Sequence, residues 1–226
     1  MPKRPELHVV DDPAIVVGDL LIEQARRGGT IVLTGGSTPG RAYEHAAAQE
    51  PDWSSVSLWW GDERCVPPDD DRSNYKLAKD TLLDRLATQP DAHRIEGELA
   101  PEEAARRYDA QIAGVELDLL LLGLGPDGHT ASLFPGSPQL DVTDVSVTSG
   151  PPGLEPFVDR VTLTLPAIQA AKRIVFLVSG ASKAEAVERA FLGEITPSVP
   201  SSLVRLAPVA VEIFLDPPAA SRMNGT

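Results

Sequence analysis

The stretch LDLLLLG, residues 117–123, is the clearest indication of how this chain folds. Apart from one aspartate it is continuously apolar, which is typical of a strand buried on both faces of a parallel sheet. Further β-rich runs predict strands at 30–34, 55–60, 160–164, 173–180 and 209–216. Because helical patterns separate these runs, the sequence predicts an α/β protein with a mainly parallel, twisted sheet covered on both faces.

Helical patterns fall at 12–27, 39–49, 74–88, 101–113 and 181–191. Residues 61–73 are predicted to form a long polar loop. Residues 134–158 are rich in proline and glycine, and we expect a loop-rich insertion there. The length and pattern predict a single domain over residues 1–226. In such sheets ligands bind at the carboxyl ends of the strands, where each motif described below lies.

Composition excludes several classes of partner. The chain has 20 Lys and Arg residues against 33 Asp and Glu, a formal net charge of -13, so we expect no nucleic acid or anionic membrane to bind. The sequence lacks an apolar run of membrane-spanning length and a secretory signal. Its one cysteine, Cys65, allows no internal disulfide and suits a reducing compartment. We expect a soluble cytoplasmic protein, with Cys65 a bystander thiol rather than a nucleophile.

Two predicted strands lead through glycine into a helix. In GGSTPGRAYE (35–44) the backbone N–H groups of Gly35, Gly36 and Ser37 can approach an anion at the helix start. A tight turn without a ligand is the alternative interpretation. In SGASKAEAV (179–187), Lys183 lies in the first helical turn, where a cation opposes the helix dipole. That position makes sense if Lys183 shares an anionic ligand; a solvated lysine is the alternative.

The segment WWGDERCVPPDDDRSNY (59–75) carries charged residues directly after a strand. Asp62 and Arg64 emerge at the strand end, which favours a binding site. The run Asp69-Asp70-Asp71 suggests a metal site at first sight. However, the sequence has no second ligand cluster at metal-site spacing, so a solvated loop is the better interpretation and we expect no metal.

The segment GLGPDGHTASLFPG (123–136) follows the most apolar strand. It places Asp127 and His129 on a glycine-rich loop at the same edge of the sheet. A histidine there can act as a general base near neutral pH, although a structural hydrogen bond would also account for it. Four such loops at one edge favour a site with a base and a phosphate group over four unrelated turns.

Taken in order, GGSTPGRAYE, GDERCVPPDDDRSNY, GLGPDGHTASLFPG, and RVTLT with SGASKAEAV resemble the motifs of the 6-phosphogluconolactonase family, over residues 33–187. The resemblance implies a three-layer α/β/α, Rossmann-like fold shared with glucosamine-6-phosphate isomerase and ribose-5-phosphate isomerase. It also implies hydrolysis of 6-phosphoglucono-δ-lactone to 6-phosphogluconate in the oxidative pentose phosphate pathway, without metal or cofactor. We expect a monomer or a weak homodimer.

In this interpretation His129 is the general base and Asp127 orients it or the substrate. The expected substrate-binding residues include Arg160, which the resemblance alone places in the pocket. The full set is Gly35, Gly36, Ser37, Asp62, Arg64, Arg160 and Lys183.

Two alternatives remain at the level of sequence. Glucosamine-6-phosphate isomerase/deaminase has Tyr after its Asp-Glu pair and a ring-opening glutamate after its histidine, where this chain has Arg64 and Phe134. The second is a sugar-phosphate sensor domain of a bacterial repressor, which carries a helix-turn-helix segment first. We expect no room for such a segment ahead of residue 30, and the acidic charge also favours an enzyme.

Overall fold

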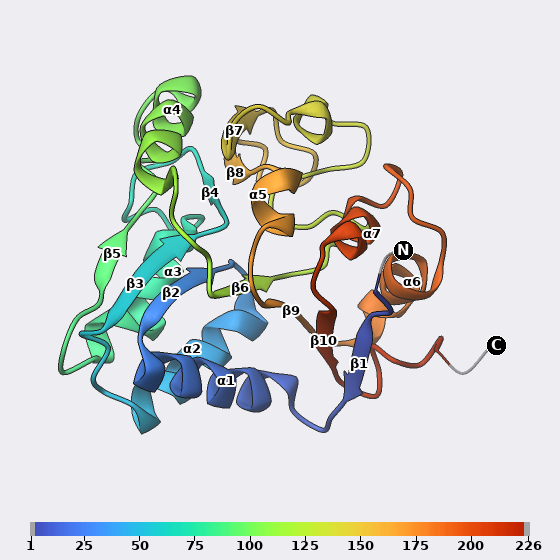
Figure 1. Ribbon diagram of the computed structural model, residues 1–226, viewed down its shortest axis with the longest axis horizontal. Coiled ribbons are helices and arrows are strands. Elements are labelled where there is room, and N and C mark those ends of the chain that lie inside the picture. The colour runs from blue at the N-terminus through green and yellow to red at the C-terminus, as the bar shows by residue number, and fades with distance from the viewer. Residues whose placement is uncertain (1–2, 224–226) are drawn as a thin grey trace.

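The computed structural model describes residues 3–223, and a seven-stranded sheet runs through its centre (Figure 1). The strand order is β1-β10-β9-β6-β2-β3-β5, and every neighbouring pair is parallel. The strands are β1 (Glu6–Val9), β2 (Gly29–Leu33), β3 (Val56–Trp60), β5 (Asp91–His93), β6 (Leu119–Leu122), β9 (Ile174–Val178) and β10 (Val211–Leu215). The sequence predicted five of them and missed β1 and β5, the short, partly exposed edge strands.

The central strands are buried on both faces. All four leucines of β6 have 0% exposure, and β9 is buried throughout. Helices α1 (Pro13–Arg27) and α2 (Ser37–Gln49) lie along one side of the sheet in Figure 1, and α4 (Pro101–Ile112) lies on the other. The prediction from 117–123 is thus confirmed: an uninterrupted apolar strand lies where neither face meets water.

Two predicted helices differ from the structure. The helix expected at 74–88 ends as α3 (Asn74–Thr81), because Leu82 leaves the helical conformation and a 3₁₀ turn, η1 (Leu83–Arg85), follows. The one expected at 181–191 is a 3₁₀ turn η3 (Ala181–Lys183), a short α6 (Ala184–Val187) and a π turn η4 (Glu188–Leu192). The remaining helical turns are η2 (Pro138–Asp141), α5 (Leu165–Gln169), α7 (Pro200–Leu203) and η5 (Val204–Leu206).

A second, antiparallel sheet stands beside the carboxyl end of the large one (Figure 1). It comprises β4 (Asp62–Arg64), β8 (Arg160–Leu163) and β7 (Val147–Gly150), in the order β4-β8-β7. Two expectations need correction here: the predicted loop 61–73 contains β4, and the predicted strand 160–164 is β8 of this sheet rather than a strand of the large one. The segment 134–158, expected to be loop-rich, contains η2 and β7. Gly61 joins the two sheets: its N–H donates to Leu33 O and its carbonyl accepts from Leu163 N.

Two buried tyrosines fix the strand ends at which the loops begin. The Tyr43 hydroxyl accepts from Thr34 N (3.0 Å) and donates to Thr34 O (2.7 Å) at the end of β2. The Tyr108 hydroxyl pairs in the same way with the backbone of Trp60 at the end of β3. Buried backbone groups need hydrogen-bond partners where the pairing between strands stops. These hydroxyls supply the partners, so the segments after β2 and β3 can turn away from the sheet without losing hydrogen bonds.

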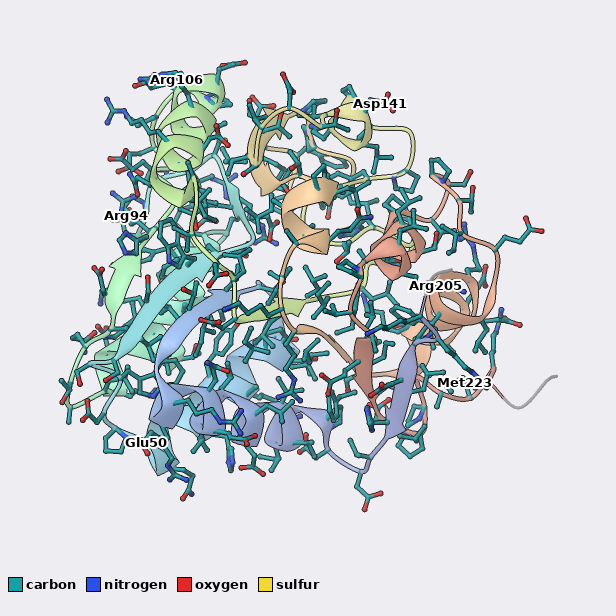
Figure 2. The ribbon with its side chains drawn as sticks, in the orientation of Figure 1. Glu50, Arg94, Arg106, Asp141, Arg205 and Met223 are labelled. Atoms are coloured by element: carbon teal, nitrogen blue, oxygen red, sulfur yellow. The ribbon has the colours of Figure 1, made fainter. Side chains whose placement is uncertain are left out.

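Charged side chains occupy the outer surface. Arg106 on α4 and Glu50 after α2 point outward on opposite sides of the molecule (Figure 2). Each is in an ion pair, Arg106 with Glu103 and Glu50 with Arg26. Across residues 3–223 no helix has the length and apolar character needed to cross a membrane.

Candidate active site

A cavity of about 250 Å³ opens where the segments after β2, β3, β6 and β9 converge. Among residues 3–223, six of the predicted site residues line it and three, Ser37, Asp127 and Arg160, do not. The six are Gly35, Gly36, Asp62, Arg64, His129 and Lys183. Six residues that the sequence predicted to lie together at the carboxyl edge of the parallel sheet therefore line one cavity there.

His129 and Asp127 form a hydrogen-bonded pair at this cavity. Asp127 Oδ1 lies 2.6 Å from His129 Nδ1 and also accepts the His129 backbone N–H at 3.1 Å. Partial burial by itself would raise the pKa of Asp127, but these hydrogen bonds outweigh it and hold that pKa below its ordinary value. An ionised Asp127 accepts the Nδ1 proton, so the lone pair of the neutral imidazole is on Nε2.

The loop around His129 depends on close packing. A Cβ on Gly125 would lie 2.0 Å from His129 Nδ1, so only glycine leaves room for the ring. The Phe134 ring also packs on the imidazole, with its centroid 4.6 Å from that of His129. Phe134 is itself buried against Gly153, where a Cβ would meet its ring at 2.3 Å. The imidazole therefore has little freedom to rotate.

Two residues of this site were not predicted. Asn74 lines the cavity and donates from Nδ2 to Asp62, and Ser132 Oγ donates to Asp62 Oδ2 at 2.7 Å. Both lie inside motifs recognised in the sequence. However, residue type gave no reason to prefer them, because a loop asparagine or serine usually satisfies local backbone groups. Only their contacts with a buried carboxylate distinguish them.

Two arginines are neighbours on adjacent strands of the small sheet, because Arg64 pairs with Arg160 in the register of β4 and β8. Arg64 reaches the cavity and donates from Nη1 to Arg72 O at 2.6 Å. Arg160 is only 3% exposed and donates from Nη2 to Leu154 O and Pro156 O. Burial, aided by the Arg64 charge, lowers the pKa of Arg160. Arg160 Nη1 is buried without a hydrogen-bond partner in the described part of the chain.

The glycine turn after β2 leaves its helix start open. Gly36 caps α2 with φ +111°, and its carbonyl accepts from Gly40 N. Within residues 3–223 no side chain caps this helix end. The helix begins at Ser37, two residues before the predicted start at 39. Gly35 and Gly36 lie at the cavity wall, so the first N–H groups of the helix lie beside the cavity.

The turn after β9 is built differently. Gly180 N donates to both oxygens of Asp216, at 3.0 and 2.9 Å, and Ser179 Oγ donates to the same carboxylate. What this turn contributes to the cavity is Lys183, whose Nζ donates to Leu124 O at 2.7 Å. Partial burial lowers the pKa of Lys183, while the charge of Asp127 acts in the opposite direction.

Two residues of the acidic run 69–71 form ion pairs. Asp70 pairs with Arg72 at 2.6 Å and Asp71 with Lys76 at 3.4 Å. In the described residues, no group of three or more His, Cys, Asp or Glu side chains could hold a metal ion. Burial raises the pKa of the Cys65 thiol to about 11, with a contribution from Asp159, so Cys65 stays protonated at neutral pH.

The chain is thus an α/β protein with a cavity at the carboxyl edge of its parallel sheet, beside a histidine–aspartate pair. Residues 19–212 match the family model described as glucosamine-6-phosphate isomerases/6-phosphogluconolactonase. The chain therefore belongs to this family, as the four motifs indicated.

Relatives within the family agree with that assignment. The chain is 42% identical over 185 residues to a 6-phosphogluconolactonase of Synechocystis sp., covering 76% of each chain. It is 37% identical to that of Mycobacterium leprae, covering 89% of this chain and 87% of the relative. The solved 6-phosphogluconolactonase from Trypanosoma cruzi superposes with a TM-score of 0.88 at 27% identity, covering 99% and 98%. A monomeric glucosamine-6-phosphate deaminase, at 20% identity, shares the fold with a TM-score of 0.85.

Proposed function

We propose that this protein hydrolyses 6-phosphoglucono-δ-lactone to 6-phosphogluconate, the second step of the oxidative pentose phosphate pathway. The observation that carries the proposal is the His129–Asp127 pair, packed against Phe134 at the wall of the cavity. The relatives that cover most of the chain carry the name of this activity.

In the proposed reaction His129 Nε2 takes a proton from water as the water oxygen attacks the lactone carbonyl carbon. The bond between that carbon and the ring oxygen then breaks, and the imidazolium returns its proton to the departing oxygen. Asp127 keeps Nδ1 protonated throughout and stabilises the imidazolium by its negative charge. The second proton of the water stays on the new carboxyl group and dissociates into solvent, so the histidine ends each cycle neutral and no further reactant is needed.

The substrate phosphate is assigned to the open start of α2, where the N–H groups of Gly35, Gly36 and Ser37 lie. Arg64 and Lys183 supply the cationic side chains at the cavity wall. Arg160 remains part of the proposal as a second cation, paired with Arg64 on the adjacent strand but outside the cavity wall. Asp62 is placed to accept a hydrogen bond from a sugar hydroxyl.

Phe134 distinguishes this activity from sugar-phosphate isomerisation. It occupies the position at which the resemblance places the ring-opening glutamate of the isomerases, and its ring packs on His129. A phenyl ring cannot transfer a proton, whereas lactone hydrolysis requires only one acid–base group. The deaminase-like alternative is therefore not favoured.

The test is an assay of the purified protein with freshly prepared 6-phosphogluconolactone, following acid release above the spontaneous rate. We expect turnover that persists after exhaustive dialysis against a chelator, and no ammonia release from glucosamine 6-phosphate. Hydrolysis at only the spontaneous rate would refute the proposed function. Ammonia release at a comparable rate would favour the deaminase instead.

A cytoplasmic location and a monomeric or weakly dimeric state complete the proposal. They rest on the single, partly buried cysteine and on the net charge of -13, which disfavours self-association. Sedimentation at increasing protein concentration tests the second point, because a tight oligomer would show no dissociation on dilution.

A further inference from the structure

Asn74 connects two walls of the cavity that come from different parts of the chain. It is the first residue of α3, is 2% exposed, and lines the cavity. Its Nδ2 donates to the Asp62 carbonyl oxygen at 2.9 Å and to Asp62 Oδ1 at 3.2 Å. A single amide group therefore binds both the backbone and the carboxylate of Asp62.

The other end of the same amide faces the glycine turn after β2. A Cβ built on Gly35 would lie 1.9 Å from Asn74 Oδ1, so the side chain of Asn74 fills the space that a Gly35 side chain would need. Within residues 3–223, Oδ1 is buried without a hydrogen-bond partner. The reverse orientation of the amide would set its oxygen against two oxygens of Asp62, so the observed orientation is the stable one.

The start of α3, to which Asn74 belongs, is fixed by hydrogen bonds to the Glu63 carboxylate. Glu63 accepts from Asn74 N at 2.7 Å, from Tyr75 N at 2.8 Å and from Ser73 Oγ at 2.9 Å. The second carboxylate oxygen of Asp62, Oδ2, is held independently, because it accepts from Ser132 Oγ, three residues after His129. The amide of Asn74 thus stands between a fixed carboxylate and a fixed glycine turn.

We propose that Asn74 is a positioning residue: it fixes the distance and orientation of the Asp62 carboxylate relative to the Gly35–Gly36 turn. This inference rests on the proposed lactone hydrolysis, in which Asp62 holds the sugar and the turn holds the phosphate. Asn74 acts through Asp62 and takes no part in proton transfer. Because the two walls hold opposite ends of one substrate, their separation decides whether the carbonyl carbon lies within reach of the water held by His129.

The decisive variant is Asn74→Asp, which keeps the shape of the side chain but replaces the donor by a carboxylate oxygen. At neutral pH the two adjacent carboxylates repel each other, and Asp62 moves. As the pH falls, one shared proton restores a hydrogen bond between them. The ratio of kcat/KM of the variant to that of the wild type should therefore rise as the pH is lowered from about 8 to about 5. At neutral pH we expect a loss of about 10- to 100-fold.

Two further variants separate positioning from stability. Asn74→Ala should show a similar loss at neutral pH, with a ratio that does not change with pH, because no proton can replace the missing donor. Ser73→Ala is the matched control: it removes the cap of α3 and the bond from Ser73 to Glu63, and it should lower Tm. Glu63 still accepts from Asn74 N and Tyr75 N, and the bonds from Asn74 to Asp62 stay in place. Its activity ratio should also be independent of pH.

A flat ratio for Asn74→Asp, or kcat/KM within about twofold of the wild type for Asn74→Ala, would overturn the inference. A loss of activity in Ser73→Ala as large as that in Asn74→Ala would also overturn it, because a purely structural role of the start of α3 would then suffice. Wild-type protein without lactonase activity would instead refute the proposed function, so the two failures can be told apart.

Discussion

The two strand–glycine–helix turns at the cavity, after β2 and after β9, look alike in sequence and differ in what they offer a ligand. The turn after β2 leads into the 13-residue helix α2, and in the described residues no capping side chain accepts from the first N–H groups of this helix. The turn after β9 leads into a three-residue 3₁₀ turn, and the Gly180 N–H is already bonded to Asp216. The first offers backbone donors, whereas the second offers the side chain of Lys183.

A glycine before a helix is therefore not sufficient for an anion site. The donors must also be free, and at Gly180 a carboxylate from the end of β10 has taken the place that an anion would occupy. The following predictions test this division of roles, in order of decreasing effect.

His129→Asn should have the largest effect, because it removes the base while both turns remain. We expect kcat to fall by about 10²- to 10⁴-fold. The affinity for 6-phosphogluconate, measured by calorimetry, should change little. Turnover near the wild-type rate would remove His129 from the mechanism, and a parallel loss of affinity would mean that the loop rather than the two turns holds the product.

Lys183→Ala should remove the contribution of the turn after β9. A charge-assisted hydrogen bond to phosphate in a partly buried site contributes roughly 1.5–3 kcal/mol, so kcat/KM for the phosphorylated lactone should fall by about 10- to 100-fold. Hydrolysis of unphosphorylated gluconolactone should be affected much less. Equal losses for the two lactones would show that Lys183 does not contact the phosphate.

Gly36→Ala and Gly180→Ala form a matched pair. Both glycines have positive φ, +111° and +98°, and a new Cβ would meet Pro39 Cδ at 3.6 Å in the first case and no atom of residues 3–223 within 4 Å in the second. Both glycines lie in a backbone region that is essentially restricted to glycine, with ψ of 158° and 147°, so strain of about 1–3 kcal/mol should lower Tm similarly in both variants. Only Gly36→Ala should reduce kcat/KM for the phosphorylated lactone by about tenfold, because it displaces donors that are free to bind phosphate.

If Gly180→Ala impairs use of the phosphorylated lactone as strongly as Gly36→Ala, the division between the two turns is wrong. Gluconolactone without phosphate serves as the control substrate, since neither change should affect it beyond a general loss of folded protein.

Asp216→Asn should have the smallest effect, on stability alone. Partial burial would raise the pKa of Asp216, but the hydrogen bonds from Ser179, Ala219 and Gly180 outweigh it and keep that pKa below its ordinary value. The stabilisation is therefore present above the unfolded-state pKa and disappears as the pH falls through the folded-state pKa.

At neutral pH the variant should melt about 2–4 °C lower than the wild type, for roughly 1 kcal/mol lost. The gap should close below about pH 4. A gap in Tm that does not change with pH would mean that the charge of Asp216 is unimportant.

The sequence predicted some features of the site and missed others for a physical reason. The Asp127–His129 pair was predictable because its partners are two residues apart on one loop. The bond from Ser132 to Asp62 spans 70 residues, and that from Gly180 to Asp216 spans 36. Such partners meet only after the sheet has formed, so no local pattern indicates them.

From the sequence alone one could predict the buried centre of the large sheet and several of the residues that lie at its carboxyl edge. Uninterrupted apolar runs can be buried only between two covering layers, and a loop that follows such a strand must emerge at the edge of the sheet. Tertiary structure alone decided that 160–163 joins the small sheet and that Arg160 faces inward to bind carbonyls while Arg64 reaches the cavity. Those outcomes depend on which strands pair, and pairing is set by contacts between segments far apart in the chain.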